Sequence, residues 1–546
     1  MVQVIISMSG FGERFKKAGY TSPKPLIKVD NKPMIEHVVS MFPSIPSTSF
    51  IFICNREHLE STNMKKECER IANGCTIVSI EPHKFGPVYA VSQAYNFIKD
   101  DEEVIVSYCD FGSYWNFYEF RKDCEKRNLD GCVVCYRGFH PHMLGTDNYA
   151  FVKPVKDDDT LLEEIQEKKP YTSNKMQEWA SNGVYYFKKG SYVKHYFTQM
   201  INEGEKINGE FYVSMVYNLL KKDGLKIGVF PIEHMLQWGT PYDLDVYNQW
   251  SLYFERIIKP KQILNNPKNT ITILPMAGKG SRFSMKGYTR PKPLLDVNGY
   301  PMFFQAVDCL PTSESTTWIT LKEHCEQYPE VEETIKDHFP KSNIIKLNNV
   351  TEGQACTCYE AVKDIDDETP ILITACDNAS YWNVEEYKSL LEDTTNDIIV
   401  WSFKNNPTSK NNPNMYSWLE VENGFVKKAH VKNCIFDNPY EENAIIGTFF
   451  FRKAKYFKEA YNSMVEKNIR TGNEFYVDNM LNECIEQERT VVNFSVLHYI
   501  CWGIPDEYET YQYWRRYFHK SSSHPYKIYK DCTFNQKSIE LFTSEI

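Results

Sequence analysis

The chain repeats one segment of its own sequence. Residues 4–40 read VIISMSGFGERFKKAGYTSPKPLIKVDNKPMIEHVVS, and residues 272–308 read TILPMAGKGSRFSMKGYTRPKPLLDVNGYPMFFQAVD. The residues that recur at a constant offset of 268 are Gly10, Gly12, Arg14, Phe15, Gly19, Tyr20, Pro23, Lys24, Pro25 and Leu26, as Gly278, Gly280, Arg282, Phe283, Gly287, Tyr288, Pro291, Lys292, Pro293 and Leu294. Repetition at this fixed spacing indicates that a whole domain is duplicated.

Further matches follow in the same order along both halves. Residues 108–116 match 375–383, residues 209–213 match 473–477, and Trp238-Gly239-Thr240-Pro241 matches Trp502-Gly503-Ile504-Pro505. The sequence therefore predicts one domain over 1–260, a linker over 261–269, a second domain over 270–520 and a tail over 521–546. The linker is rich in proline, asparagine and lysine, which are typical of connecting segments.

Short apolar runs alternate with longer helix-like stretches in each copy. We expect buried strands at Val2–Ser7, Phe50–Ile53, Thr76–Ile80, Val104–Ser107 and Cys132–Tyr136, and helices at Pro33–Met41 and Tyr89–Asp100. Such alternation predicts βα units around a mostly parallel sheet.

The composition excludes several classes of protein. A formal net charge of −10 argues against nonspecific nucleic-acid binding, which requires many Lys and Arg contacts to phosphates. No apolar run approaches the roughly 18–20 residues that span a bilayer, and the start of the chain lacks the features of a signal peptide. With 16 scattered cysteines, the sequence predicts reduced thiols and a cytoplasmic location, without a membrane partner. The Cys132-Val133-Val134-Cys135 run is interpreted as core thiols in a strand, not as a metal site.

The doubled segment has the chemistry of a phosphate-binding loop. A strand followed by G-x-G-x-R predicts a tight glycine turn that opens into a helix, with backbone N–H groups facing an anion. The pattern is not the dinucleotide fingerprint, because Phe15 and Phe283 replace the third glycine, and it is not a P-loop, because no GK[ST] follows. The added Arg and the Lys ten residues later suit stabilisation of a transferring phosphoryl group.

Asp110 and Asp377 each follow an apolar strand-like run. Ligand sites of open α/β sheets lie at the carboxyl ends of strands. A carboxylate is also a preferred ligand of Mg²⁺ when that ion carries phosphates. We therefore predict Asp110 and Asp377 as metal-binding residues.

The run M-x-G-x-G-x-R-F…G-Y-x-x-P-K-P-L, the later Cys-Asp and the W-G-x-P run resemble the sugar-1-phosphate nucleotidyltransferases. The resemblance covers both halves and implies two tandem Rossmann-like α/β domains with mixed, mostly parallel central sheets. It also implies Mg²⁺-dependent transfer of a nucleotidyl group from an NTP to a sugar 1-phosphate, giving an NDP-sugar and pyrophosphate for glycan assembly. The residues predicted to grip the NTP phosphates are Gly10, Gly12, Arg14, Lys24, Gly278, Gly280, Arg282 and Lys292.

The resemblance assigns further roles residue by residue. Sugar-phosphate contacts are predicted at Glu167, Lys168, Gly183, Glu210, Lys432, Gly447 and Glu474. Base contacts are predicted at Glu81, Gly86, Asn348 and Gly353, and a Glu would suit the paired N–H donors of guanine.

Each half departs from the family pattern. Gln237 and Cys501 stand where many members have a second metal-binding Asp, and Val431 stands at the position of Glu167. Glu13 lies inside the first phosphate loop, where a carboxylate is unfavourable unless it points away. Three alternatives stay open: a catalytic half joined to a regulatory half, a cytidylyltransferase acting on a non-sugar phosphate, and a binding scaffold without pyrophosphorylase activity.

Overall fold

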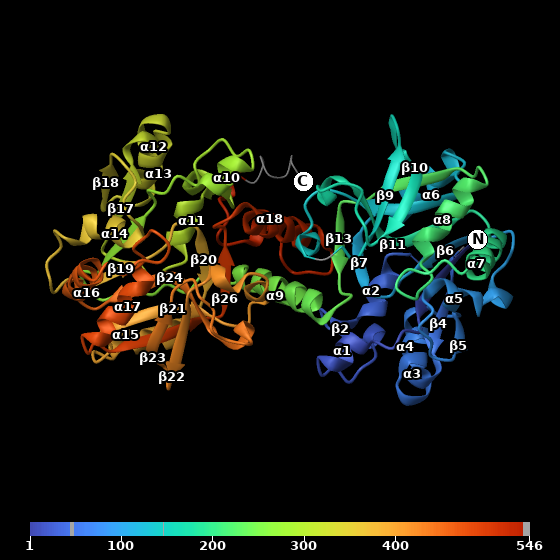
Figure 1. Cartoon of the computed structure of the whole chain (residues 1–546), viewed down its shortest axis with the longest axis horizontal. Coiled ribbons are helices and arrows are strands. Elements are labelled where there is room, and N and C mark those ends of the chain that lie inside the picture. The colour runs from blue at the N-terminus through green and yellow to red at the C-terminus, as the bar shows by residue number, and fades with distance from the viewer. Residues whose placement is uncertain (44–47, 146, 539–546) are drawn as a thin grey trace. The chain divides into compact units, whose positions relative to one another are not determined.

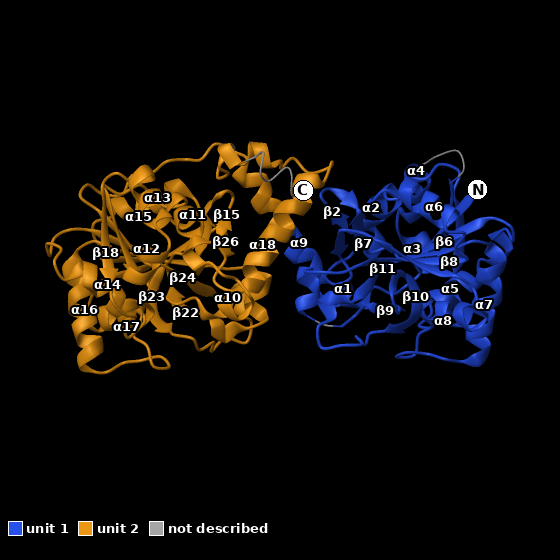
Figure 2. Cartoon of the chain, turned by 90° about the horizontal axis from the view of Figure 1, so that it is seen from above, with its two compact units in different colours: residues 1–248 blue, residues 249–546 orange. Residues whose placement is uncertain are grey.

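The computed structural model describes residues 1–43, 48–145 and 147–538. The chain divides into two compact units, Met1–Asn248 and Gln249–Ile546 (Figure 2). The division falls within helix α9 (Pro241–Ile257). The domain limits and the 261–269 linker expected from the sequence stay predictions, and residues 539–546 of the expected tail lie outside the described residues.

The N-terminal unit is built on a nine-stranded sheet (Figure 1). Its order is β5-β4-β1-β6-β11-β8-β12-β10-β9, with β11 and β10 antiparallel to the other strands. The strands are β1 Val2–Met8, β2 Lys28–Val29, β3 Lys32–Pro33, β4 Thr48–Asn55, β5 Thr76–Ile80, β6 Glu103–Ser107, β7 Phe111–Tyr114, β8 Gly131–Tyr136, β9 Ala150–Val155, β10 Asp158–Glu167, β11 Trp179–Phe187, β12 Ile227–Pro231 and β13 His234–Gln237. The helices before α9 are α1 Glu13–Lys17, α2 Met34–Ser40, α3 Arg56–Ser61, α4 Met64–Ile71, α5 Pro87–Ser92, α6 Phe117–Lys126, α7 Gly190–Glu203 and α8 Val213–Lys222.

The C-terminal unit has the same sheet order, β18-β17-β14-β19-β24-β21-β25-β23-β22. Its strands are β14 Ile271–Pro275, β15 Asp296–Val297, β16 Tyr300–Pro301, β17 Ser315–Leu321, β18 Ser342–Leu347, β19 Ile371–Ile373, β20 Asn378–Tyr381, β21 Ile398–Phe403, β22 Trp418–Glu422, β23 Phe425–His430, β24 Asn443–Phe451, β25 Val491–Val496 and β26 His498–Cys501. Its helices are α10 Ser281–Met285, α11 Met302–Asp308, α12 Lys322–Gln327, α13 Glu330–His338, α14 Gln354–Val362, α15 Val384–Glu392, α16 Ala454–Glu466, α17 Val477–Glu486 and α18 Pro505–Lys520. The expectation of two Rossmann-like α/β domains with mixed sheets is confirmed.

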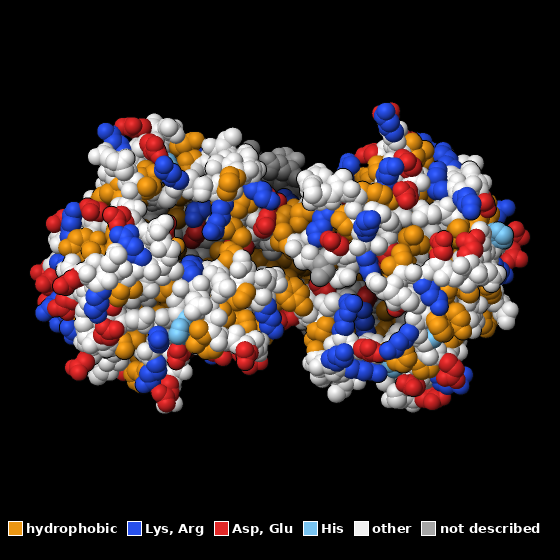
Figure 3. All heavy atoms as spheres, viewed as in Figure 1, with side chains coloured by type: hydrophobic (Ala, Val, Ile, Leu, Met, Phe, Trp, Pro, Cys, Tyr) orange, Lys and Arg blue, Asp and Glu red, His pale blue; other side chains and the backbone are white. Residues whose placement is uncertain are grey.

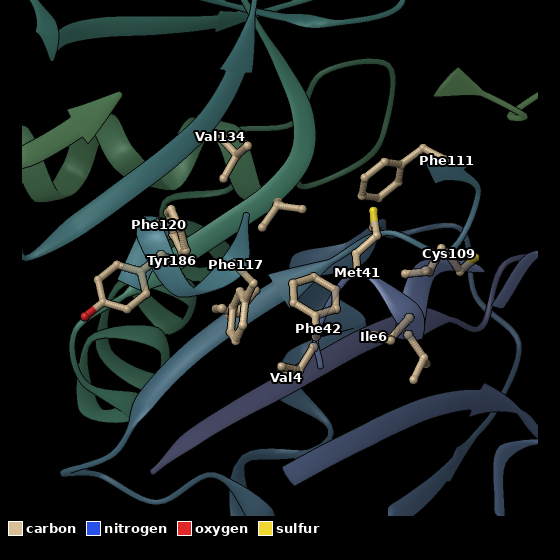
Figure 4. Close-up of a cluster of buried hydrophobic side chains, with 14 of the residues drawn as sticks. Val4, Ile6, Met41, Phe42, Cys109, Phe111, Phe117, Phe120, Val134 and Tyr186 are labelled. Carbon is tan, nitrogen blue, oxygen red and sulfur yellow. The ribbon is translucent and has the colours of Figure 1, made fainter. Parts of the chain in front are cut away.

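Side chains of successive strand residues point to opposite faces of the sheet, and helices cover both faces. In β1, Val4 and Ile6 belong to the core under α2, α4 and α6, which Figure 4 shows in close-up. Ile5, between them, belongs to the core under α5, α7 and α8. A strand buried on both faces has no polar alternation, which is why these strands were recognisable as continuous apolar runs.

The expected strands all form, but the expected helix Tyr89–Asp100 is wrong beyond Ser92. Helix α5 ends there, and a short 3₁₀ turn, Tyr95–Phe97, follows. The buried side chain of Gln3 holds this segment by donating to the Phe97 carbonyl at 2.9 Å and accepting from Lys99 N–H at 2.7 Å. A contact from β1 thus overrides the local helical preference.

Cys132 and Cys135 lie in β8 with buried side chains, as expected for core thiols, and burial raises the pKa of each.

No helix among the described residues is both long and apolar enough to cross a membrane. On the face seen in Figure 3, positive and negative side chains are interspersed over both units. The cations that would handle phosphate therefore have to be sought locally, at the ends of the strands.

Candidate active sites

The glycine turn forms in both units between the first strand and a short helix. In the N-terminal unit β1 ends at Met8 and α1 begins at Glu13, with Gly12 at the helix start in the left-handed region at φ +65°. Gly280 takes the same position before α10 at φ +61°. A side chain at this backbone conformation is strained, so the repeated glycine has a structural reason. A Cβ at Gly12 would also lie 3.7 Å from Lys24 Cβ.

The predicted phosphate lysine and metal aspartate lie together in each unit. Lys24 Nζ donates to Asp110 Oδ2, and Lys292 Nζ donates to Asp377 Oδ2 at 2.6 Å. Burial alone would lower the pKa of Lys292, but the Asp377 carboxylate raises it above the ordinary value. Each lysine is therefore a fixed cation next to a carboxylate that the sequence placed more than 80 residues away.

A two-stranded ribbon places the late W-G-x-P run beside these aspartates. Strand β7, which follows Asp110, pairs with β13, and Phe111 lies opposite Gln237. Strand β20 pairs with β26 in the same way, with Asn378 opposite Cys501. Trp238 N–H donates to the Asp110 carbonyl at 3.0 Å, and Trp502 N–H donates to that of Asp377 at 2.8 Å.

Two cavities open over these residues in the N-terminal unit. One, of about 560 Å³, is lined by the glycine loop and by Glu210. The other, of about 240 Å³, is lined by Glu167, Lys168 and Gly183. Both are lined by Arg14, Lys24, Tyr108, Asp110, Tyr212 and Gly239. The residues predicted to hold NTP phosphates and those predicted to hold a sugar phosphate thus line two cavities that share one set of charged residues.

The predicted sugar-phosphate lysine has an unusual backbone in both units. Lys168 and Lys432 are in the left-handed region, at φ +58° and +54°. The Lys168 ammonium donates to the Tyr212 hydroxyl at 2.5 Å, and the Lys432 ammonium lies 5.9 Å from the centre of the Tyr476 ring. The predicted sugar glycines, Gly183 and Gly447, also have positive φ, at +95° and +83°.

Equivalent backbone contacts in the two units hold the glycines predicted near the base, Gly86 and Gly353, in place. Gly86 and Gly353 begin helices α5 and α14 with positive φ, and their Cα hydrogens face backbone atoms of Phe211 and Phe475. Phe211 directly follows Glu210, whose carboxylate accepts a hydrogen bond from the Tyr212 hydroxyl. The structure thus brings the predicted Gly86 and Glu210 together.

The predicted base contact Glu81 is not brought to these cavities. The Glu81 carboxylate is 69% exposed, pairs with Arg56, and is absent from the lining of both cavities described for its unit. Asn348 is exposed just after β18. The assignment of Glu81 to the base is not favoured by this geometry, and both assignments stay predictions.

His83, Lys84 and Asn208 line the larger cavity, although the sequence did not suggest them. Lys84 pairs with Glu13 at 2.9 Å, and this hydrogen bond lowers the pKa of Glu13. The carboxylate inside the first phosphate loop is therefore paired. A signal was present in the repeat: Ser281 and Thr351 replace Glu13 and Lys84 together in the second copy.

Two further partly buried carboxylates lie near the predicted metal aspartates and were also missed. Burial raises the pKa of Asp243 to about 6, and the Asp110 carboxylate adds to this shift. Burial likewise raises the pKa of Glu507, as does Asp377, while its hydrogen bond with Cys501 opposes the shift. Both residues follow the W-G-x-P run by a few positions, in the first turn of α9 and α18.

Comparison with known proteins adds to this geometry. Residues 3–218 match the family described as Nucleotidyl transferase. The match lies within the N-terminal unit and includes the first copy of the phosphate-handling segment. The resemblance carried by the first copy of that segment is thereby confirmed.

The chain is similar to several curated proteins over part of its length. Mannose-1-phosphate guanyltransferase of Schizosaccharomyces pombe is 24% identical over 186 residues, which are 34% of this chain and 49% of that protein. The protein of the same name from Yarrowia lipolytica is 27% identical over 143 residues, 26% of this chain and 39% of that protein. The chain spans about half or less of the length of these relatives.

Solved structures are similar to about half of the chain. A nucleoside-diphosphate-sugar pyrophosphorylase from Vibrio cholerae is 21% identical, with a TM-score of 0.37, over 45% of this chain and 99% of that one. A UDP-glucose pyrophosphorylase complexed with UDP-glucose is 15% identical, with a TM-score of 0.37, over 47% of this chain and 100% of that one.

Proposed function

We propose that this chain transfers a nucleotidyl group from an NTP to a sugar 1-phosphate, releasing pyrophosphate and forming an NDP-sugar. The observation that carries the proposal is the pair of cavities in the N-terminal unit that share Arg14, Lys24 and Asp110. Such an arrangement suits two phosphorylated substrates whose phosphates meet at the shared residues. The similarity to mannose-1-phosphate guanyltransferases makes GTP with mannose 1-phosphate the first pair to test.

The chemistry needs positioning more than proton transfer. A phosphate oxygen of the sugar 1-phosphate attacks the α-phosphorus of the NTP, and the bond from that phosphorus to the bridging oxygen of the leaving pyrophosphate breaks. The nucleophile is already anionic, so no general base is required. Arg14 and Lys24 would hold the phosphates in line and stabilise the charge that develops on the leaving group.

Mg²⁺ is part of the proposal, because the oxygen donors of the N-terminal unit fit it. A Cβ at Gly239 would lie 3.2 Å from Asp110 Oδ2 and 2.7 Å from Gln237 Nε2, and turning the Gln237 amide over would bring its carbonyl oxygen into the space beside Asp110. The described residues contain no group of three or more His, Cys, Asp or Glu side chains that would hold a metal. Mg²⁺ commonly takes one or two protein oxygens and completes its shell with water and substrate phosphates. Bound there, it would neutralise phosphate charge.

The C-terminal unit offers a poorer set of donors. Cys501 replaces Gln237, and burial, together with the Glu507 and Asp377 carboxylates, raises the pKa of its thiol. A protonated thiol is a poor ligand for Mg²⁺, which prefers oxygen. This observation favours a second candidate function, in which the N-terminal unit is catalytic and the C-terminal unit binds a sugar nucleotide as a regulator.

The test is pyrophosphate release by the full-length chain, measured with each NTP against a panel of sugar 1-phosphates and phosphocholine. We expect Asp110→Ala and Asp377→Ala each to remove the activity of its own unit, and the double variant to remove all of it. An unaffected rate in Asp377→Ala would support the regulatory role. Activity in the double variant, activity only with phosphocholine, or no activity with any pair would overturn the proposal.

A further inference from the structure

In both units a carboxylate, partly buried in the first and buried in the second, lies close to the lysine with left-handed backbone angles, but it comes from different elements. In the N-terminal unit it is Glu167, the last residue of β10 and the residue before Lys168. Ser214, in the first turn of α8, donates to Glu167 Oε2 at 2.6 Å. Burial raises the pKa of Glu167, while Ser214 and Lys168 oppose the shift.

The C-terminal unit has exchanged these two positions. The offset of 264 residues that relates Lys168 to Lys432 also relates Glu167 to Val431 and Ser214 to Asp478. The strand position has lost its carboxylate, and the helix position has gained one. Asp478 lies in the first turn of α17 and is 8% exposed.

A hydroxyl donor has moved together with the carboxylate. Ser417 donates to Asp478 Oδ2 at 2.5 Å. Ser417 precedes Trp418, which pairs with Ala444 as Phe151 pairs with Ala180 in the first unit, so Ser417 occupies the position of Ala150. Ala150 lines the smaller cavity of the N-terminal unit. The new hydroxyl therefore stands at a position that faces the sugar-phosphate cavity.

The charged surroundings of the two carboxylates correspond. Burial, Glu210 and Glu167 raise the pKa of Tyr212, and Arg14 opposes them. Burial, Glu474 and Asp478 raise the pKa of Tyr476 to about 12, and Arg282 opposes them. Asp478 thus affects the pKa of Tyr476 as Glu167 affects that of Tyr212.

Helix capping does not account for Asp478. The residue at the start of α17 is Tyr476, and no side chain caps that end. Burying a carboxylate is costly unless it is paired or hydrogen-bonded, and the serine found at this position in the first unit is uncharged. Ser417 and the nearby Lys432 offset part of this cost, and together they surround a carboxylate that the first unit does not have at this position.

We propose that Asp478 accepts sugar hydroxyl hydrogen bonds in the C-terminal unit, in the role predicted for Glu167 in the N-terminal unit. The inference rests on the proposed function, because it assumes that the C-terminal unit binds a sugar 1-phosphate beside Lys432. The acceptor of the C-terminal unit is one methylene shorter and approaches from a helix instead of a strand. The two units therefore select sugar 1-phosphates that differ in the position or orientation of a hydroxyl group.

The test uses the full-length chain with Asp110→Ala, which silences the N-terminal unit. Adding Asp478→Ser should raise KM for the sugar 1-phosphate about 10- to 100-fold, the effect of losing a charged hydrogen-bond acceptor, and leave KM for the NTP unchanged. Asp478→Asn, which keeps the shape, separates the loss of charge from misfolding. Adding Val431→Glu to Asp478→Ser should restore binding and shift the sugar preference toward that of the N-terminal unit.

The matched control is Glu167→Val with Ser214→Asp in the Asp377→Ala chain, which should shift preference in the opposite direction. Unchanged sugar KM in both Asp478 variants, or equal loss of affinity for NTP and sugar, would overturn the inference. If Asp110→Ala alone abolishes pyrophosphate release, the catalytic part of the proposed function fails for this unit. Calorimetric titration with the sugar phosphates then decides the inference, because Asp478→Ser must still remove one binding site.

Discussion

In the N-terminal unit Lys24 pairs with Asp110, and in the C-terminal unit Lys292 pairs with Asp377 in the same way. The residues around these pairs differ. Glu167 of the first unit is Val431 in the second, and Gln237 is Cys501. Two copies in one chain have thus kept the groups that suit phosphate and changed the groups that would face the sugar and the metal. The difference separates what the shared chemistry requires from what can vary with the substrate.

The largest expected effect tests whether the Lys24–Asp110 and Lys292–Asp377 pairs contribute equally to catalysis. In chains with the other unit silenced, Lys24→Ala and Lys292→Ala should each lower kcat for pyrophosphate release about 10²- to 10³-fold, because a preorganised cation facing the developing charge is lost. Lys28→Ala, which removes an exposed lysine from β2, is the control. A fall of less than tenfold in one unit would mean that the two sites are not built for the same step.

The next effect concerns backbone packing. A Cβ at Gly86 would lie 2.8 Å from the Phe211 carbonyl oxygen, and one at Gly353 would lie 2.5 Å from that of Phe475. Both oxygens are fixed by backbone hydrogen bonds from Val88 and Ala355. Because of these close contacts and the positive φ at both positions, Gly86→Ala and Gly353→Ala should each lower the free energy of unfolding by about 2–4 kcal/mol.

Urea denaturation of the two glycine variants measures this loss. Gly10→Ala and Gly278→Ala are the controls, since no atom lies within 4 Å of a Cβ at either position. We expect the greater loss at Gly353, where the clash is closer. Equal stability of the wild-type chain and either variant would show that these backbones are free to move apart.

A buried histidine should make the C-terminal unit sensitive to acid. Burial, helped by Arg256, lowers the pKa of His498 to about 3. The unfolded chain then binds a proton below about pH 6.5 that the folded unit does not, so stability is lost as the pH falls. From pH 7 to pH 5 the C-terminal unit should lose about 2 kcal/mol of its free energy of unfolding through this residue.

His498→Phe keeps a ring at this position and should remove most of that loss in urea denaturation at the two pH values. His234→Phe, at the matched position beside Glu233, is the control for replacing the ring. An acid-induced loss that is the same with and without His498 would assign the effect to other groups.

The smallest expected effect concerns Glu13 and Lys84 at the phosphate loop, which both differ from their counterparts in the other unit. Lys84→Thr leaves Glu13 unpaired beside the phosphates and should raise the KM for NTP of the N-terminal unit about two- to fivefold. Adding Glu13→Ser, which recreates the Ser281 and Thr351 pair of the other unit, should bring the KM back. Steady-state kinetics at low ionic strength measures both. No recovery in the double variant would mean that Lys84 contacts the substrate instead of neutralising Glu13.

Much of the fold was predictable, because strands buried on both faces are continuous apolar runs and because the repeat defined two equivalent units. The end of α5 was not predictable, since Gln3 acts on it from a strand more than 90 residues earlier. Local preference cannot contain such a contact.

The candidate site was predictable where glycine, lysine and aspartate repeat at a fixed spacing, as at Gly12, Lys24 and Asp110. It was less predictable where the residue proposed for a given role lies on a different helix or strand in each unit. Val431 suggests that the C-terminal unit lacks a sugar carboxylate, and the sequence alone does not show that Asp478, 47 residues later, lies near it; the packing of α17 against β23 does. The sequence shows which helix or strand carries a residue. It does not show which residues from different helices and strands line the same cavity.

The lysine with left-handed backbone angles, Lys168 in one unit and Lys432 in the other, shows what the two units have kept as they diverged. A residue with a Cβ at φ near +55° costs the fold about 1–2 kcal/mol, which a glycine would not cost. Lys168 and Lys432 nevertheless keep their side chains in both copies, while the neighbouring residue has changed from Glu to Val. Each unit thus tolerates local instability to keep a cation at a fixed point. Thermostability screens of this protein would accordingly tend to select against its activity at these two positions.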